Sequence, residues 1–306
     1  MKTYSFSIII PHKDIPEYLV RCLNSIPERD DVQIIVVDDN SKEACTYIER
    51  YPELTRPNVE IYFTTEGKGA GYARNVGLEH AKGEWILFAD SDDYYITNHL
   101  RVLMDMAQQI TSKVVVWGVK ITTLDKGDIF DFKKNLDTIS SLENFDTTLR
   151  HVEPWRKMIR RSFIDENNLQ FEEVVASNDV RFHLQLMSFV SKEDIVQFNS
   201  NVYCWEHRNG SLFHSITLAS EKCRLNVGLR ANRFSYKHGW GYVVGTNLYL
   251  WRIKQISPTM FYLYFLKEFL FLGIVKAIAD YAFVCSKEQK RLPFLMRSLW
   301  VVASKF

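Results

Sequence analysis

Three aspartates, Asp90, Asp92 and Asp93, stand within four positions just after the apolar run WILF (85–88). Aspartate disfavours strands, and crowded carboxylates repel one another. The cluster could cap a helix, but three acids exceed what capping requires. An Asp-x-Asp pair at a strand end instead offers hard oxygen ligands to Mg²⁺ or Mn²⁺ and leaves positions for water or phosphate. The spacing therefore predicts a divalent-cation site at Asp90 and Asp92, with Asp93 as a helix cap.

A second acidic cluster, Asp38 and Asp39, ends the run VQIIVVDD and is followed by Asn40 and Ser41. Taken alone, these residues fit an Asx turn, with Ser41 as the N-cap of a following helix. Two acidic clusters at the ends of strands in one sheet favour a ligand site instead. The choice between the two interpretations depends on where the strands lie.

The segment GKGAGYARNVG (67–77) places Gly67, Gly69 and Gly71 before a helical pattern. Its position and spacing differ from the dinucleotide-binding fingerprint, and the sequence has no GxxxxGK[ST] motif, so Rossmann dehydrogenases and P-loop NTPases are disfavoured. Glycine still allows the backbone to approach a ligand closely. Arg74 is either a phosphate donor or a member of a surface salt bridge.

Strands and helices must bring these groups together. Non-alternating β-branched runs predict buried strands at 6–10, 32–39, 59–65 and 84–90. Helical patterns such as 17–26 and 70–81 lie between them, which is typical of a parallel sheet covered on both faces. Ligands bind beyond the carboxyl ends of such strands. One edge of the sheet should therefore carry residues 11–14, 38–40, 66–71 and 90–93.

The rest of the chain predicts a helix near 98–110, a strand at 113–122 and a polar, loop-rich section at 125–144. From Leu218 the composition changes to long, aromatic-rich helical patterns. We therefore expect a catalytic domain at 1–217 and a helical region at 218–306. That region could pack on the catalytic domain or on a partner subunit of a homo-oligomer, or form an interfacial helix pair at an anionic membrane.

The composition narrows the class of protein. Lys and Arg total 38 and Asp and Glu total 37, so the net charge of +1 gives no nucleic-acid footprint. Five cysteines lack CxxC spacing, which fits a reducing compartment better than a disulfide framework or a zinc site. The N-terminal SIII run is short for a signal peptide, and no run reaches the ~18–20 apolar residues of a membrane span. The expected location is the cytoplasm, with a peripheral contact at the inner face of the cell membrane.

Three segments, SIIIPHKDIPEYLVRCLNSI, QIIVVDDNS and GKGAGYARNVGLEHAKGEWILFADSDDYY, together resemble the family 2 glycosyltransferases of the GT-A fold class. The resemblance covers about residues 5–100 and extends more loosely to about residue 215. It implies a GT-A-type, Rossmann-like α/β fold: a mostly parallel sheet flanked by helices, here with a helical C-terminal extension. It also implies a nucleotide-sugar donor and transfer with inversion.

The resemblance assigns roles to residues of this chain. Asp92 and Asp90 match the family's metal-binding Asp-x-Asp motif. The residues implied to bind the nucleotide sugar are Pro11, His12, Asp14, Asp38, Asp39, Gly69, Arg74, Asn75, Asp90, Ser91 and Arg208. In the family, the segment around Arg208 can close over the diphosphate, so Arg208 could neutralise leaving-group charge.

The resemblance also locates the catalytic base. The family shows a tryptophan–lysine element, here Glu153–Lys157, and later an acidic pair before an apolar helix. The usual Glu-Asp pair is Asn178-Asp179 in this chain, a departure that leaves Asp179 as the candidate base. Alternatives are Glu172 and Glu173, which also fit solvated loop residues. Trp155 and His207 are expected at the acceptor, although His207 could equally be a metal ligand, a phosphate contact or structural.

The expected function is an inverting, Mg²⁺- or Mn²⁺-dependent glycosyltransferase. It would move a sugar from a nucleotide donor, expected to be UDP-linked, to a hydroxyl of a glycan or lipid-linked acceptor in cell-surface polysaccharide synthesis. Two alternatives stay open: a sugar-phosphate nucleotidyltransferase, and a non-catalytic nucleotide-sugar-binding protein. The first would normally carry a Gly-rich basic first loop, which PHKDIPEYL is not.

Overall fold

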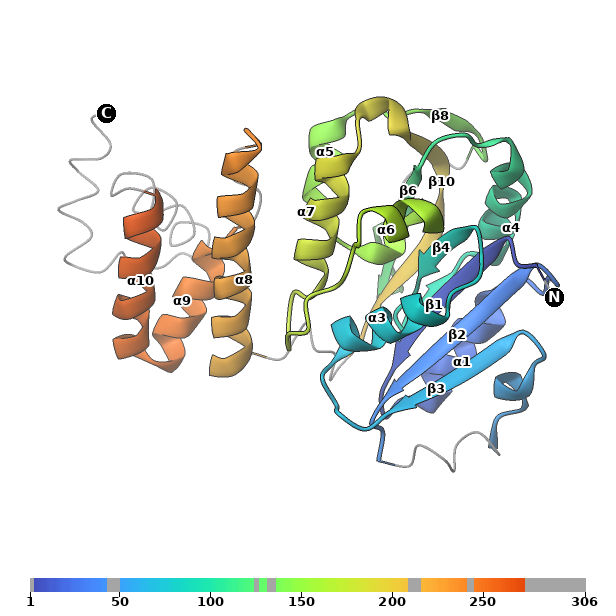
Figure 1. Cartoon of the computed structure of the whole chain (residues 1–306). Helices are drawn as coiled ribbons and strands as arrows, with labels where there is room; N and C mark the ends of the chain where they lie inside the picture. The colour runs from blue at the N-terminus through green and yellow to red at the C-terminus, as the bar shows by residue number, and fades with distance from the viewer. Residues whose placement is uncertain are drawn as a thin grey trace. The chain divides into compact units, whose positions relative to one another are not determined.

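The structure is a computed structural model that describes residues 3–42, 50–123, 127–130, 136–208, 216–240 and 245–272. The contacts divide the chain into two compact units, Met1–Ser211 and Leu212–Phe306. Figure 1 draws both units in chain order from blue to red. Each is described by itself below.

Within the described residues, the first unit contains a ten-stranded sheet in the order β3-β2-β1-β4-β9-β6-β10-β5, with β7 beside β6 and β8 beside β10. The first four strands are mutually parallel, and β10 is parallel to β6. Strand β9 is antiparallel to both of its neighbours, β4 and β6. The strand bounds are β1 Phe6–His12, β2 Val32–Asp39, β3 Val59–Thr64, β4 Trp85–Phe88, β5 Tyr94–Tyr95, β6 Val114–Thr123, β7 Gly127–Phe130, β8 Ile139–Ser141, β9 Lys157–Arg160 and β10 Ile195–His207.

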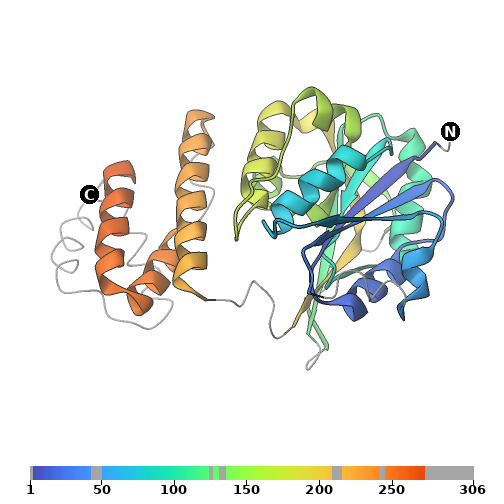
Figure 2. The same ribbon diagram turned by 60° about the horizontal axis from the view of Figure 1, so that its bottom comes forward.

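Helices cover both faces of the parallel part, and every residue of β1 and β2 is buried. Ile8 and Ile10 belong to a core shared with Leu19 and Leu23 of α1 and Leu103 of α4. Helix α3 packs on β1 and β2 from the other side, and Figure 2 shows α1 and α3 on opposite faces. The helices of this unit are α1 Pro16–Ser25, α3 Ala70–His80, α4 Thr97–Met106, α5 Phe145–Arg150, α6 Arg161–Glu166 and α7 Asp179–Phe189.

Helix α3 lies close to the sheet because small residues face it. A Cβ placed on Gly77 would collide with the side chain of Ile9, so only glycine permits this approach. The closeness matters for the site, because α3 begins directly after the glycine segment and carries Arg74 and Asn75.

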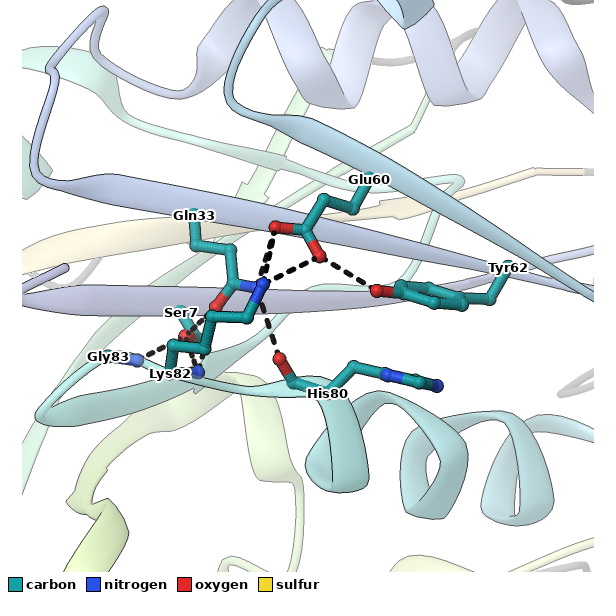
Figure 3. Close-up of polar contacts among 7 residues, drawn as sticks. All are labelled: Ser7, Gln33, Glu60, Tyr62, His80, Lys82 and Gly83. Carbon is teal, nitrogen blue, oxygen red and sulfur yellow. Dashed lines mark hydrogen bonds and ion pairs between the residues drawn. The ribbon is translucent and has the colours of Figure 1, made fainter. Parts of the chain in front are cut away.

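A polar network fixes the C-terminal end of α3 to the amino ends of β1 and β2 (Figure 3). Gln33 on β2 is its centre: the amide nitrogen Nε2 donates to Glu60 Oε1 at 3.0 Å and to the His80 carbonyl at 3.1 Å. Its Oε1 accepts from the Ser7 hydroxyl at 2.7 Å and from the Lys82 backbone N–H at 2.9 Å. Buried amides and hydroxyls are stable only when such bonds are made. The network therefore sets the position of α3 along the strands.

The strand predictions at 6–10, 32–39, 59–65, 84–90 and 113–122 are confirmed within a few residues, as are the three helices beside them. The section at 125–144, predicted to be loop-rich, also contains two short strands that were not predicted, β7 and β8. Their pairing with β6 and β10, rather than local sequence, forms them. The helix predicted to begin near Ser41 lies outside the described residues, as do Cys45, Ser211 and Cys285.

The second unit contains α8 (Leu218–Lys237), α9 (Asn247–Ile256) and α10 (Pro258–Leu272). Their shared core contains Leu225, Leu229, Leu250, Ile253 and Phe261. Thr217 caps α8, because its hydroxyl accepts the backbone N–H of Ser220 at 3.1 Å. Among the described residues, no helix is both long enough and apolar enough to cross a bilayer.

Candidate functional site

The candidate site lies at the carboxyl edge of the sheet, where β1, β2 and β4 end. The antiparallel strand β9 starts at this same edge, because Lys157, its first residue, pairs with Val116 and Met158 pairs with Leu87. The chain before β9, residues 153–156, therefore reaches the edge from the opposite direction. The sheet thus brings the segments after β1, β2, β3 and β4 and the segment before β9 to one edge.

The first loop is fixed by hydrogen bonds to the loop after β2. Pro11 and His12 continue β1 and pair with Val37 and Asp38. Asp14 has a left-handed backbone (φ 56°), which aspartate tolerates. Its N–H donates to the Ser41 hydroxyl and its carboxylate accepts from the Lys42 N–H, both at 2.8 Å. Asp14 therefore organises the loop.

His12 and Asp38 lie at the ends of adjacent strands. Burial lowers the pKa of His12 to about 4, against the opposing effect of Asp38, so the imidazole is neutral near pH 7. Asp38 is fully buried, and its Oδ1 accepts the Ser41 N–H at 2.7 Å. This bond is the Asx turn that the sequence suggests for Asp38.

Asp39 connects β2 to the glycine segment. Its Oδ2 accepts the Gly69 N–H at 2.8 Å. Gly69 has φ 92°, a conformation that favours glycine, and directly precedes α3. The Lys13 ammonium donates to the Asp39 main-chain carbonyl at 2.9 Å. A buried carboxylate therefore holds the glycine backbone at the edge of the sheet.

The Asp90–Asp93 turn is fixed from inside by Tyr203 on β10. The Asp90 N–H donates to the Tyr203 hydroxyl at 2.9 Å, and that hydroxyl donates to Asp93 Oδ2 at 3.0 Å. Asp93 Oδ1 accepts the Glu206 N–H at 2.9 Å. The prediction that Asp93 caps the next helix is wrong, because α4 begins only at Thr97 and Asp93 is buried under the turn. Burial and the two neighbouring aspartates raise its pKa well above the usual range.

The other two aspartates each contact an arginine. Asp90 forms an ion pair with Arg74. Asp92 Oδ2 accepts from Arg208 Nε at 2.8 Å. Burial and the charge of Asp90 raise the pKa of Asp92, while Arg208 opposes the rise. The buried Ser91 lies between the two carboxylates in the chain.

Arg74 joins the aspartate turn to the segment before α7. It is buried, and besides Asp90 its Nη1 donates to Asn178 Oδ1 at 2.7 Å. The Asn75 side chain donates to the Phe171 carbonyl at 3.1 Å and accepts the Phe171 N–H at 2.8 Å. Of the two roles considered for Arg74, phosphate donor or member of a surface salt bridge, the structure shows an ion pair in which Arg74 itself is buried. Asn75 holds the backbone of Phe171.

Asp179, the candidate base, is the first residue of α7 and follows Asn178 directly. Burial raises its pKa to about 6, Glu153 adds to the rise, and the Arg74 guanidinium opposes it. A carboxyl with this pKa is mostly ionised near pH 7 yet more basic than an ordinary aspartate. Glu173, one of the alternatives, is exposed and lies 3.5 Å from Lys68.

The tryptophan–lysine element contacts α7 through Lys157, which lies against His183 of that helix. The buried Lys157 ammonium lies 3.1 Å from the His151 carbonyl and 3.0 Å from His183 Nδ1. His183 Nε2 lies 3.1 Å from the Leu149 carbonyl, which fixes Nδ1 as the acceptor. His183 is one turn beyond Asp179 on α7. Burial lowers the pKa of Lys157 to about 7.

Trp155 and His207, the predicted acceptor residues, belong to one row of aromatic rings that also contains Tyr203 and Trp205. Trp155 is only 7% exposed and stacks on Tyr203 at 4.9 Å. Trp205 lies 6.2 Å from Trp155 and 4.2 Å from the His207 ring. Trp205 and His207 are the more accessible members, at the end of β10.

Sequence reasoning missed Arg21 on α1. Its Nη1 donates to Glu206 Oε1 at 2.6 Å and its Nη2 to the Asp92 carbonyl at 2.5 Å. Its guanidinium also lies 5.0 Å from the Tyr94 ring. The signal in the sequence was Glu206, an acidic residue where the family often has a basic one. A buried acid needs a cationic partner, and Arg21 is that partner.

Comparison with known proteins places this geometry in a family. The family model described as "Glycosyl transferase family 2" matches residues 7–167, more than half of the chain. Glycosyltransferase GlyA of Streptococcus pneumoniae is 24% identical over 221 residues, which cover 67% of this chain and 31% of GlyA. The poly(ribitol-phosphate) beta-N-acetylglucosaminyltransferase TarS of Staphylococcus aureus is 27% identical over 186 residues, or 59% of this chain and 32% of TarS. The chain thus spans about a third of the length of these two relatives.

The fold also matches a solved structure. The S. aureus TarS fragment 1–349 in complex with UDP-GlcNAc superposes with a TM-score of 0.61 at 20% identity, over 90% of this chain and 80% of that one. The prediction of a GT-A-type α/β fold with a helical C-terminal region is confirmed, and so is the resemblance seen in the sequence. The chain belongs to glycosyl transferase family 2.

Proposed function

We propose that the chain is an inverting glycosyltransferase that moves a sugar from a UDP-linked donor to an acceptor hydroxyl, with Asp179 as the base. The observation that carries the proposal is the position of Asp179. It has a pKa of about 6, and Arg74 links the preceding Asn178 to Asp90 of the Asp-x-Asp turn. A base and a candidate diphosphate site are therefore joined through one buried side chain.

The donor assignment is supported by the carboxyl edge and by one relative. Asp39 and the Gly69 backbone lie where β2 ends, and the aspartate turn lies where β4 ends. A nucleoside and its diphosphate would span such an edge. The S. aureus TarS fragment of the same fold was solved as a complex with UDP-GlcNAc, which supports UDP as the nucleotide here.

The aspartate turn fits a divalent cation. Asp90 and Asp92 each have a carboxylate oxygen bound to an arginine. Burial and the neighbouring Asp90 charge raise the pKa of Asp92, and a bound cation would offset both effects. Among the described residues, no group of three or more His, Cys, Asp or Glu side chains forms a complete metal site. Two carboxylates suffice for Mg²⁺ or Mn²⁺ when substrate phosphates complete the coordination. Bound there, the cation would stabilise charge on the departing diphosphate.

The chain's own groups then perform the transfer. Ionised Asp179 accepts the proton of the acceptor hydroxyl, and the hydroxyl oxygen attacks the anomeric carbon from the face opposite the diphosphate. The bond from that carbon to the diphosphate oxygen breaks, and its electron pair stays on the diphosphate. Arg208, directly after β10, is close enough to the turn to neutralise part of this charge. The configuration at the anomeric carbon inverts.

The acceptor is proposed at the 153–157 and 205–207 side of the site. TarS and a Bacillus spizizenii relative are named as poly(ribitol-phosphate) glycosyltransferases, which supports a hydroxyl on a cell-surface polymer. The partly exposed side chains of Trp205 and His207 offer a surface on which a sugar or polyol could pack. The Trp155 ring packs against Trp205 on its buried side.

Replacing Asp179 tests the proposal. We expect Asp179→Asn to lower kcat about 10²–10⁴-fold, because the amide cannot accept the proton. The control Asp165→Asn changes an exposed aspartate on α6 and should keep full activity. The measurement is transfer or donor hydrolysis with Mn²⁺, using the donor that most stabilises the protein in a thermal-shift panel of nucleotide sugars. Wild-type turnover by Asp179→Asn would refute the assignment of the base.

The same assay separates the two alternative functions. A nucleotidyltransferase would release pyrophosphate from a nucleoside triphosphate rather than UDP from a UDP-sugar. A non-catalytic binding protein would show donor-induced stabilisation without any turnover, and Asp179→Asn would then change nothing.

A further inference from the structure

The Asp92–Arg208 contact raises a question about the proposed cation site. Arg208 Nε lies 2.8 Å from Asp92 Oδ2, and the two side chains are only 16% and 21% exposed. Charge-assisted hydrogen bonds with this geometry are among the stronger ones in proteins. The carboxylate expected to bind the cation therefore already has a cation of the chain on one of its oxygens.

The other arginines at the turn are held differently. Arg74 is buried between Asp90 and Asn178 and lies 5.3 Å from the Phe171 ring. Arg21 is held between the Glu206 carboxylate and the main-chain carbonyl of Asp92. Arg74 is also held by Asn178 and Arg21 by Glu206, so neither arginine depends only on a carboxylate of the proposed cation site.

Arg208 differs from both. Within the described residues, its contacts are the Asp92 carboxylate and the Tyr18 ring, 5.2 Å from its guanidinium carbon. Apart from the weaker contact with Tyr18, the position of Arg208 therefore depends on the Asp92 carboxylate, and a divalent cation would compete for that same carboxylate.

We infer that Arg208 is an internal counter-cation, which neutralises Asp92 in the donor-free protein and leaves it when Mg²⁺ or Mn²⁺ binds. The inference rests on the proposed function. Two cations at one carboxylate repel each other, so cation binding weakens the Asp92–Arg208 pair and favours release of the guanidinium. The freed guanidinium then lies beside the turn, where a diphosphate would accept its hydrogen bonds. By linkage, a diphosphate that draws Arg208 away strengthens cation binding by the same factor.

The inference makes an unusual prediction: removing an arginine should tighten binding of a metal ion. We expect Arg208→Met to bind Mn²⁺ about tenfold more tightly than the wild type without donor, because no charge-assisted pair must be broken. Free Mn²⁺ is measured by electron paramagnetic resonance in a titration of the whole chain. The variant should also transfer sugar more slowly, because the departing diphosphate no longer receives hydrogen bonds from the Arg208 guanidinium.

Arg21→Met is the matched control. It removes a charge that also lies at Asp92, but one bound to the main-chain carbonyl and to Glu206 rather than to the carboxylate. Its Mn²⁺ affinity should not rise, because Arg208 still occupies the Asp92 carboxylate. The turn also loses the hydrogen bond from Arg21 to the Asp92 carbonyl. If Arg208→Met fails to fold by circular dichroism, Arg208→Gln removes the charge with less loss of polarity and should tighten Mn²⁺ binding in the same direction.

The outcomes separate this inference from the proposed function. Equal or weaker Mn²⁺ binding by the Arg208 variants would overturn the inference and leave the enzyme assignment intact. Equal gains in the Arg208 and Arg21 variants would also overturn it, because they would show a general effect of charge. If the wild type bound no Mn²⁺ with or without UDP, the cation site itself would fall, and the inference with it.

Discussion

At the scale of single residues, Asp179 owes its basicity to its surroundings. Burial raises its pKa, Glu153 adds to the rise, and Arg74 limits it. The same arginine binds Asp90 and Asn178, so one side chain contacts the aspartate turn and also lowers the pKa of the proposed base Asp179. Asn178, which stands where the family usually has glutamate, keeps an oxygen for Arg74 without adding a second charge beside Asp179.

The pH dependence of transfer should report this environment. The ionised form of Asp179 is the proposed base, so we expect kcat/KM to rise with pH through about 6 and then level off. Arg74→Gln removes the cation that stabilises ionised Asp179, and the rise should therefore move to higher pH. Pre-steady-state rates from about pH 5 to 8 check both results. A profile that Arg74→Gln left in place would contradict the electrostatic contact between the two residues.

At the scale of elements, the glycine segment and the 171–178 segment fit tightly together. A Cβ at Gly71 would meet the Glu172 carbonyl oxygen and the Asn178 Cβ well within van der Waals distance. The Glu172 N–H also donates to the Asn178 carbonyl at 3.1 Å, which closes the segment on itself. The start of α3 thus determines how the segment before Asp179 is placed.

We expect Gly71→Ala to lower the free energy of unfolding by about 1–3 kcal/mol, as overpacking does, and also to lower kcat. The matched control is Gly83→Ala, where a Cβ would collide with the backbone of Phe6 and Ser7 at the opposite edge of the sheet. That variant should lose stability but keep the kcat of the folded fraction. Thermal unfolding and steady-state kinetics of both variants make the comparison. A full kcat for Gly71→Ala would show that the two segments are not coupled.

The strands of the parallel half could be predicted from sequence because their runs are rich in β-branched and aromatic residues, and because clustered acids end β2 and follow β4. Strand β9 could not, since KMIR has no distinctive pattern and its position depends on pairing with β4 and β6. The acidic residues of the site were found by type and order. The contacts of Arg74 were not, because its partners lie 16 and 104 positions away. Arg21 was missed for the same reason: its partner Glu206 is 185 positions away.

At the scale of the whole molecule, the second unit carries exposed apolar residues on α10, Tyr262 and Leu263. Deleting the chain after Ser257, the simplest test of membrane contact, would also remove Phe261 from the core that α8, α9 and α10 share. Point substitutions are therefore the better probe of the proposed peripheral contact with a membrane. The cations and apolar residues at 273–306 lie outside the described residues.

We expect the wild-type chain to sediment with vesicles of anionic phospholipid, and the double variant Tyr262→Gln, Leu263→Gln to stay in solution, because apolar insertion drives such contacts. Tyr236→Gln on α8, also at an exposed tyrosine, is the control and should sediment like the wild type. Equal sedimentation of all three proteins would exclude α10 as the membrane contact.

The antiparallel strand β9 has a consequence for how the chain folds during synthesis. Strands β1 to β4 lie within the first 88 residues and pair mainly with their neighbours in sequence, so they can assemble while the rest of the chain is still being made. Strand β4 then has one open edge, which only residues 157–160 can close. Until the ribosome has added them, β6 cannot join β4 in one sheet, because β9 lies between these two strands. A nascent chain paused before residue 157 should therefore be a prominent target for chaperones, because an open strand edge invites pairing with other chains.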